Sequence, residues 1–192
     1  MTRQEENFIE CCLNNKISNI KTLVKHNVDI TVSEYWGYRI AATKGYIDLL
    51  KYLYSVDNNH ELISKSGILS WAATNGQLDS VEFIINQSDC YKSDTSTLQW
   101  TAASGNVDMI SLLIPYCTYF DWIIVSAAKS GQTELLSFLF DNEIEKLDRN
   151  YKLGFNNAVL SRKKKTATLF IERQIILEAE IDKDVWEKYC AL

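Results

Sequence analysis

Four acidic residues recur at nearly even spacing and are the side chains best placed to do chemistry. Asp48, Asp79, Asp108 and Glu134 each stand three residues after a glycine. Such a series of carboxylates could bind a divalent cation or a basic peptide. The alternative is that each acid lies in the first turn of a helix and offsets the positive end of the helix dipole. We favour this alternative, because the spacing predicts a spaced row of acids and not a chelating cluster.

Other reactive residue types give no sign of a catalytic site. The two histidines, His26 and His60, leave little room for a zinc site or a catalytic triad. Nucleophile-elbow, phosphate-loop and zinc-protease motifs do not occur in the sequence. We therefore expect no enzyme activity, no cofactor and no metal. The cysteines form no CxxC pair and are expected to be reduced thiols packed as small apolar side chains: Cys11, Cys12, Cys90, Cys117 and Cys190.

Composition excludes several classes of partner. The chain has 192 residues, of which 46 % are hydrophobic, so it can bury a sizeable core. Its net charge of −5 gives no overall attraction to nucleic acid or to acidic membranes. The apolar runs are too short to span a bilayer, and the polar start MTRQEEN lacks the apolar core of a signal peptide. We expect a protein of the cytoplasm or nucleus that is not secreted by a cleaved signal.

The elements that must position the acids are repeated along the chain. AATKGYIDLLKYL is followed by AATNGQLDSVEFI, TAASGNVDMISLL and AAKSGQTELLSFL. In each copy, small residues stand three and four positions before the glycine, and apolar residues stand five and eight positions after it. We call this glycine the mark of its repeat; the four marks are Gly45, Gly76, Gly105 and Gly131.

Each repeated position has a physical reason. The small pair lets neighbouring helices approach closely, and glycine ends a helix in the left-handed conformation. The apolar residues after the acid fall on one face of a second, longer helix. Two fainter copies flank the four: Asn15 is the mark after Cys11 and Cys12, and Ser161 is the mark after Ala158. The pattern predicts stacked helix pairs whose terminal copies diverge.

This pattern resembles the ankyrin repeat. The resemblance covers about residues 7–141 clearly and the remainder weakly, and LVKHNVDI (Leu23 to Ile30) resembles the turn between ankyrin repeats. It implies an all-α helical solenoid, with about five repeats in residues 1–150 and a degenerate repeat with a C-terminal helical cap in residues 151–192. The short repeats, rich in Asn, Ile, Lys and Tyr, are similar to those of large DNA viruses of amoebae, which would place the protein in a host cell.

The sequence departs from the family consensus at the start of each repeat. The Thr-Pro-Leu-His motif is replaced by GYRI, ILSW, TLQW and IIVS. The hydrogen-bond network that this motif forms between repeats must be absent or rebuilt from other side chains. The repeats are also shorter than the roughly 33 residues typical of the family. We therefore expect reduced β-hairpin fingers between the helix pairs.

The resemblance also suggests where a partner would bind. In ankyrin proteins the two residues before the mark face the concave groove, and plain solvated helix ends are the alternative here. Carried across the four copies, these residues are Thr43, Lys44, Thr74, Asn75, Ala103, Ser104, Lys129 and Ser130.

Aromatic side chains near the repeat openings add further candidates. Surface binding and half-buried turn packing both remain open for four of them: Tyr35, Trp36, Tyr119 and Trp122. Trp71 and Trp100 occupy one position, five before the mark. There we expect core packing between stacked units in preference to an aromatic binding strip.

The C-terminal region carries two more features. SRKKK (Ser161 to Lys165) could be a nuclear-import signal or a phosphate contact, but a solvated helix face is the simpler interpretation. The tail has apolar residues at one-sided helical spacing, which predicts a cap on the last repeat, with docking of a partner helix as the alternative. These residues are Leu169, Ile171, Ile175, Ile176, Ala179 and Ile181.

The resemblance implies protein–protein recognition through an elongated concave surface, by a protein that we expect to be monomeric. Three roles remain open. The protein could be a stand-alone binding module. It could be an adaptor whose C-terminal helices recruit machinery such as a ubiquitin ligase. It could be a component of a structural assembly.

Overall fold

The computed structural model describes residues 1–57, 67–87, 95–117, 120, 122–143 and 150–192. All regular structure in this part of the chain is helical, and none of its residues forms a strand. The fold is a helical solenoid of stacked helix pairs, as the repeat predicts. Contacts divide the chain into two compact units, Met1–Tyr91 and Lys92–Leu192. Each unit is described by itself.

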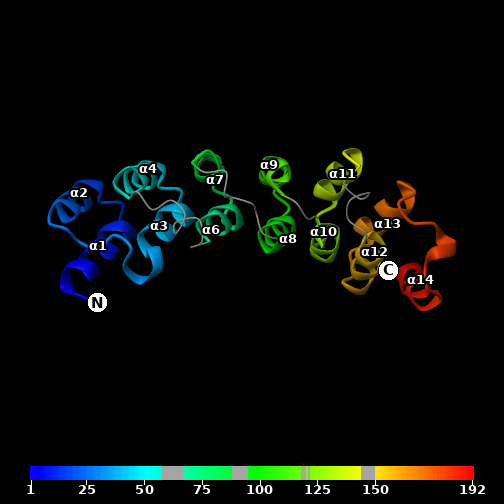
Figure 1. Ribbon diagram of the computed structural model, residues 1–192. Coiled ribbons are helices and arrows are strands. Elements are labelled where there is room, and N and C mark those ends of the chain that lie inside the picture. Colours follow the sequence, from blue (N-terminus) through cyan, green and yellow to red (C-terminus); the bar gives the residue numbers. More distant parts are fainter. Residues whose placement is uncertain (58–66, 88–94, 118–119, 121, 144–149) are drawn as a thin grey trace. The chain divides into compact units, whose positions relative to one another are not determined.

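The described part of unit 1 contains three helix pairs arranged in two layers (Figure 1). The first helices of the pairs pack side by side in one layer, and the second helices form the other. The pairs are α1 (Arg3–Leu13) with α2 (Ile17–Lys25), α3 (Val32–Lys44) with α4 (Ile47–Val56), and α6 (Ile68–Thr74) with α7 (Leu78–Ile85).

The described part of unit 2 repeats this arrangement with three further pairs and a final helix (Figure 1). Helix α10 packs between α8 and α12, and α11 packs between α9 and α13. The pairs are α8 (Thr95–Ser104) with α9 (Val107–Leu113), α10 (Ile123–Ser130) with α11 (Thr133–Asp141), and α12 (Tyr151–Leu160) with α13 (Lys164–Glu172). The 3-10 turns η1 (Ile114–Tyr116) and η3 (Glu178–Glu180) and the helix α14 (Lys183–Cys190) also belong to this unit.

The mark residues end the first helices as the sequence predicts. Gly131, with φ of 80°, follows α10, and the next N–H, that of Gln132, donates to the carbonyl oxygen of Ala127 at 2.9 Å. This bond satisfies a carbonyl that the end of the helix would otherwise leave unpaired. Asn15 takes the same role in the first pair with φ of 51°. A left-handed residue thus sets the turn in both glycine-marked and asparagine-marked repeats.

The mark of the sixth pair lies one residue later than predicted. Ser161 has φ of −87°, whereas Arg162 has φ of 57°. The N–H of Lys163 donates to the carbonyl oxygen of Ala158 at 2.8 Å, which is the bond that defines the mark elsewhere. The position three after the mark, acidic in the four glycine-marked repeats, is therefore Lys165.

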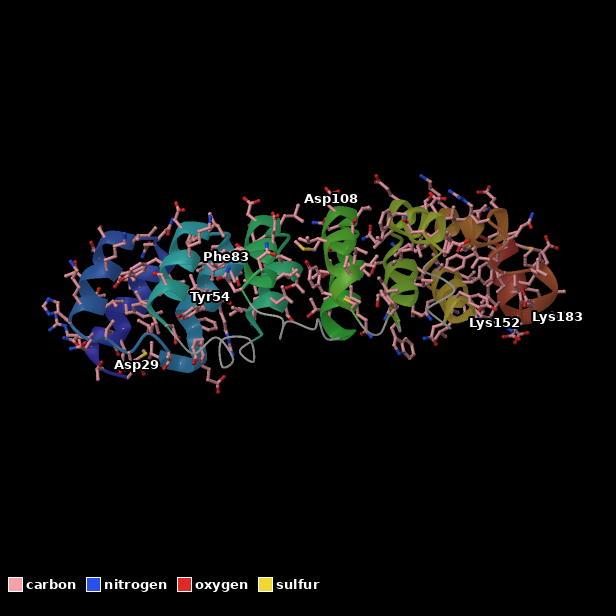
Figure 2. All side chains as sticks on the ribbon, turned by 45° about the horizontal axis from the view of Figure 1, so that its top comes forward. Asp29, Tyr54, Phe83, Asp108, Lys152 and Lys183 are labelled. Atoms are coloured by element: carbon pink, nitrogen blue, oxygen red, sulfur yellow. The ribbon has the colours of Figure 1, made fainter. Side chains whose placement is uncertain are left out.

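The core lies between the two helical layers of each unit. The small pairs before the marks are buried, and so are the predicted apolar residues of the second helices, such as Leu50, Leu53, Leu136 and Leu139. In unit 1, the ring of Tyr54 on α4 contacts the ring of Phe83 on α7 edge to face at 5.3 Å (Figure 2). Burial of these apolar surfaces against the neighbouring pair provides the main stabilisation.

Two expectations concern the segments outside the repeat helices. The expected β-hairpin fingers fall mainly on residues outside the described part, while residues 26–31, between α2 and α3, form turns without a strand. The tail does not form one continuous helix, since α13 ends at Glu172 and Gln174 takes φ of 54°. Of the predicted tail residues, Ile176 and Ile181 are buried and Ala179 is exposed.

Candidate functional site

A shallow apolar depression in unit 1 brings several of the predicted residues together. Its volume is about 170 Å³, and its wall consists almost entirely of apolar atoms. The indoles of Trp36 and Trp71 are 39 % and 44 % exposed. The residues that line this Trp36–Trp71 depression are Leu13, Trp36, Arg39, Ile40, Thr43, Lys44 and Trp71.

Helix geometry explains why these side chains meet. Trp36, Ile40 and Thr43 follow one another on one face of α3, because residues three or four apart are neighbours on a helix. Trp71 comes from α6, which packs beside α3. Arg39 and Lys44 contribute to the apolar wall with their aliphatic stems, so their charged groups stand at its rim. Arg39 pairs with the exposed Glu34 at 3.5 Å.

A second depression, in unit 2, is more polar but also combines an exposed tryptophan with a lysine. Its volume is about 390 Å³, and Trp100, at 68 % exposure, is the large aromatic residue in it. Trp100 stands five residues before its mark, as Trp71 does, and Lys129 provides the positive charge. The residues that line this Trp100–Lys129 depression are Gln99, Trp100, Ala103, Ser126, Lys129, Ser130 and Ser161.

The prediction that Trp71 and Trp100 are core residues is wrong. The same position of the second repeat holds Ile40, which is buried. The buried alanine pairs let the first helices approach closely, and this spacing leaves room for an isoleucine but not for an indole. The two tryptophans therefore project from the first-helix layer of their units.

Comparison with known families agrees with this architecture. The family described as "Ankyrin repeats (3 copies)" matches residues 38–121 and 69–150, which together cover more than half of the chain. The chain belongs to the ankyrin-repeat family. No curated protein matches it. Ankyrin repeats generally mediate protein–protein interaction, so the exposed residues of the first helices are the natural candidates for a binding site.

Three of the predicted groove residues of these ankyrin repeats form side-chain hydrogen bonds with the backbone of their own helices. The hydroxyl of Thr74 donates to the carbonyl oxygen of Ser70 at 2.7 Å, and the side-chain amide of Asn75 donates to that of Trp71 at 2.8 Å. The hydroxyl of Ser104 donates to a carbonyl oxygen of α8 at 2.7 Å. These three residues lie outside both depressions.

The aromatic residues at the repeat openings differ in how far they are buried. Tyr35 is half-buried with its ring 5.5 Å from that of Tyr38, and burial, aided by the charges of Asp57 and Asp29, raises its pKa. Trp122 is 45 % exposed at the N-terminus of α10 and does not line the Trp100–Lys129 depression. Tyr119 lies outside the described residues.

Sequence reasoning missed Leu13, although a signal was present. Leu13 stands two residues before Asn15, the mark of the first repeat, as Thr43 stands two residues before Gly45. The predicted groove residues come only from the four glycine-marked repeats. Extending the prediction to Asn15 would have identified Leu13, which is 48 % exposed.

The acids and the lysine cluster occupy exposed helix starts. Asp48, Asp79, Asp108 and Glu134 lie in the first turns of α4, α7, α9 and α11, where each meets the positive end of a helix dipole (Asp108 in Figure 2). Within the described ranges, no three His, Cys, Asp or Glu residues gather as metal ligands would. The lysines of SRKKK are exposed at the start of α13. Among the described helices, none combines the length and apolar character needed to cross a bilayer.

Proposed function

We propose that this protein is a non-enzymatic binding module that recognises a protein partner through the first-helix layers of its ankyrin repeats. The observation that carries the proposal is the exposure of three large aromatic side chains, Trp36, Trp71 and Trp100, in depressions beside lysines. Tryptophan is among the residues that contribute most to binding energy at protein interfaces. The helices that present these side chains are packed into the core, so little conformational freedom is lost on binding.

Charge-reversal variants test this function. The protein would be cross-linked to its partners in a lysate of its source cells, as wild type and as Lys44→Glu, Lys129→Glu and Lys152→Glu. Lys152 is the matched control, since it is exposed on α12 outside both depressions (Figure 2). We expect Lys44→Glu or Lys129→Glu to reduce recovery of a protein that Lys152→Glu recovers fully. Equal recovery by all four proteins would exclude both depressions as binding sites.

Two narrower roles follow from the sequence. An adaptor would use the C-terminal helices to recruit a second protein, and a structural component would associate with copies of itself. Packing of α12 on α10 and of α13 on α11 favours the role of a cap that protects the last repeats. We therefore place a monomeric binding module of the cytoplasm or nucleus before both alternatives.

A further inference from the structure

The Trp36–Trp71 depression has the size of a single large side chain. Its volume of about 170 Å³ compares with the roughly 150 Å³ of an engineered apolar cavity that binds benzene. A phenylalanine or leucine side chain would therefore fill it. A bound helix would need a row of anchors about one turn apart, whereas a depression that accepts one side chain suits an extended segment.

The apolar wall supplies the affinity for such a side chain. Trp36, Trp71 and Leu13 are the exposed large apolar residues of this wall. Covering apolar surface releases about 25 cal/mol for each Å² removed from water. Two indoles presented on packed helices are rigid anchors, which lowers the entropy lost on binding.

The charges around the depression determine which flanking residues would be accepted. Lys44 is exposed and has no ion pair in the described part of the chain. Arg39 is less accessible to a partner, because its side chain is only 22 % exposed and already pairs with Glu34 at 3.5 Å. None of the described residues that line the depression is acidic. The rim therefore favours acidic groups.

The Trp100–Lys129 depression shows the same selection of residue types. It too combines an exposed tryptophan with a lysine, and no acid is among its lining residues. This is notable because acidic residues outnumber basic ones in the chain, 25 to 20. Acids thus line neither depression while they occupy the starts of the second helices.

We propose that the Trp36–Trp71 depression binds one large apolar side chain of an acidic, extended segment in a partner protein. The apolar side chain fills the space between the two indoles, and a carboxylate beside it reaches Lys44. This inference rests on the proposed function and adds the chemistry of the partner at one site.

A display library of random 12-residue peptides tests this inference without knowledge of the partner. Peptides would be selected on the full-length protein after removal of those that bind the Trp71→Ala variant. Enriched peptides would then be labelled, and their dissociation constants measured by fluorescence anisotropy at low and high salt. The proteins compared are wild type, Trp71→Ala, Lys44→Glu and Trp122→Ala. Trp122 is the matched control, because it is as exposed as Trp71 and lies outside the depression.

We expect enriched peptides in which Asp or Glu residues flank a Phe, Leu, Met or Trp. Their affinity should fall at least about tenfold with Trp71→Ala, as for a residue at the centre of an interface. It should fall several-fold with Lys44→Glu and at high salt, and change by less than about twofold with Trp122→Ala. Circular dichroism of each variant would verify that the fold is retained.

Three results would overturn the inference. The first is the absence of any peptide that prefers wild type to Trp71→Ala. The second is enrichment of peptides without an excess of acidic residues. The third is enriched peptides whose affinity changes neither with Lys44→Glu nor with salt concentration. All three leave the cross-linking test of the proposed function intact, so the two ideas can fail separately.

Discussion

The side-chain amide of Gln132 donates a hydrogen bond of 2.8 Å to the carbonyl oxygen of Ala103 and so joins two neighbouring repeats. Gln132 directly follows the mark of its own repeat, and its amide group lies over Gly105, the mark of the preceding one. In unit 1, Gln77 lies over Gly45 in the same way. The residue after a mark thus reaches back to the preceding mark, and Gln132 supplies a hydrogen bond between repeats that lack the Thr-Pro-Leu-His motif. The side-chain amide of Gln77 instead donates to the carbonyl oxygen of Asn75, in its own repeat, at 3.2 Å.

Because of the contact with Gln132, we expect Gly105→Ala to lower the free energy of unfolding by more than the strain of its left-handed backbone alone. Gly105 has φ of 78°, a conformation that costs alanine about 1–2 kcal/mol. The added Cβ would also lie 2.6 Å from the side-chain amide carbon of Gln132 and displace that group. Loss of its hydrogen bond adds about 1 kcal/mol. Urea denaturation should therefore show that Gly105→Ala lowers the free energy of unfolding by about 2–3 kcal/mol.

Gly67→Ala is the matched control for this prediction. Gly67 has a similar φ of 74°, but a Cβ there has no atom of the described residues within 4 Å. Gly67→Ala should lower the free energy of unfolding only by the strain of the left-handed backbone, about 1–2 kcal/mol. Equal losses for the two variants would show that the contact with Gln132 contributes nothing.

A buried tyrosine gives a second prediction. Tyr38 is fully buried, and its hydroxyl donates to the carbonyl oxygen of Leu53 at 2.9 Å and to the buried carboxylate of Asp57 at 3.1 Å. Removing a donor from buried acceptors costs about 1–3 kcal/mol, so Tyr38→Phe should lower the free energy of unfolding by that amount. Tyr52→Phe is the control, because the hydroxyl of Tyr52 has no hydrogen bond in the described region. A change within about 0.5 kcal/mol is expected there. Equal losses in both variants would refute the prediction.

The features that could be predicted from the sequence depend on local chemistry. The marks were found because a left-handed helix end prefers glycine, and the first-turn acids because a helix dipole favours negative charge at its start. Each preference acts within a few residues and recurs in every copy. The helix pairs and the core positions of the second helices therefore followed from the pattern.

The features that were missed depend on neighbouring repeats. Burial at the position five before the mark is decided by the volume of the side chain and the spacing of adjacent helices, so Ile40 is buried and Trp71 is not. The sixth mark is Arg162, because the helix α12 extends one residue further than the spacing of small residues implied. Arginine has no preference for the left-handed conformation that would reveal this. The Trp36–Trp71 depression, formed by side chains from different repeats, could not be predicted for the same reason.

The buried thiol of Cys12 predicts a loss of stability at alkaline pH. Burial, with a smaller contribution from Cys11, raises its pKa from 9.0 to about 12. The thiol ionises in the unfolded chain above pH 9 but stays protonated in the folded protein up to about pH 12. Stability is therefore complete below pH 9 and decreases between pH 9 and 12, by at most about 1.4 kcal/mol per pH unit from this group.

Denaturation of wild type and Cys12→Ala between pH 8 and 10.5 isolates this contribution. The variant leaves a small cavity and should be less stable at pH 8, but its stability should fall less steeply with pH. If the free energy of unfolding of both proteins fell equally steeply with pH, the raised pKa of Cys12 would be contradicted. As a second readout, iodoacetamide at pH 8 should modify the exposed Cys190 and leave Cys12 unmodified in the folded protein.

The last helices of unit 2 predict how the chain responds to shortening. The ring of Phe170 on α13 lies 5.2 Å from that of Phe140 on α11, and Gly154 on α12 approaches Ile124 on α10. A chain that ends at residue 150 exposes the apolar faces of α10 and α11. Because repeats are stabilised by their neighbours, thermal unfolding of unit 2 should shift to lower temperature by more than about 5 °C, or the protein should aggregate.

A chain that ends at residue 176 is the matched control for this deletion. It removes α14, whose Tyr189 contacts the ring of Phe155 at 5.9 Å and the hydroxyl of Thr168 at 3.0 Å, but it keeps α12 and α13. The smaller loss of packing should shift unfolding by less than half as much. If the chain ending at residue 150 instead keeps the full unfolding temperature, the C-terminal helices do not stabilise the repeats. Their apolar residues would then serve recruitment, as in the adaptor role.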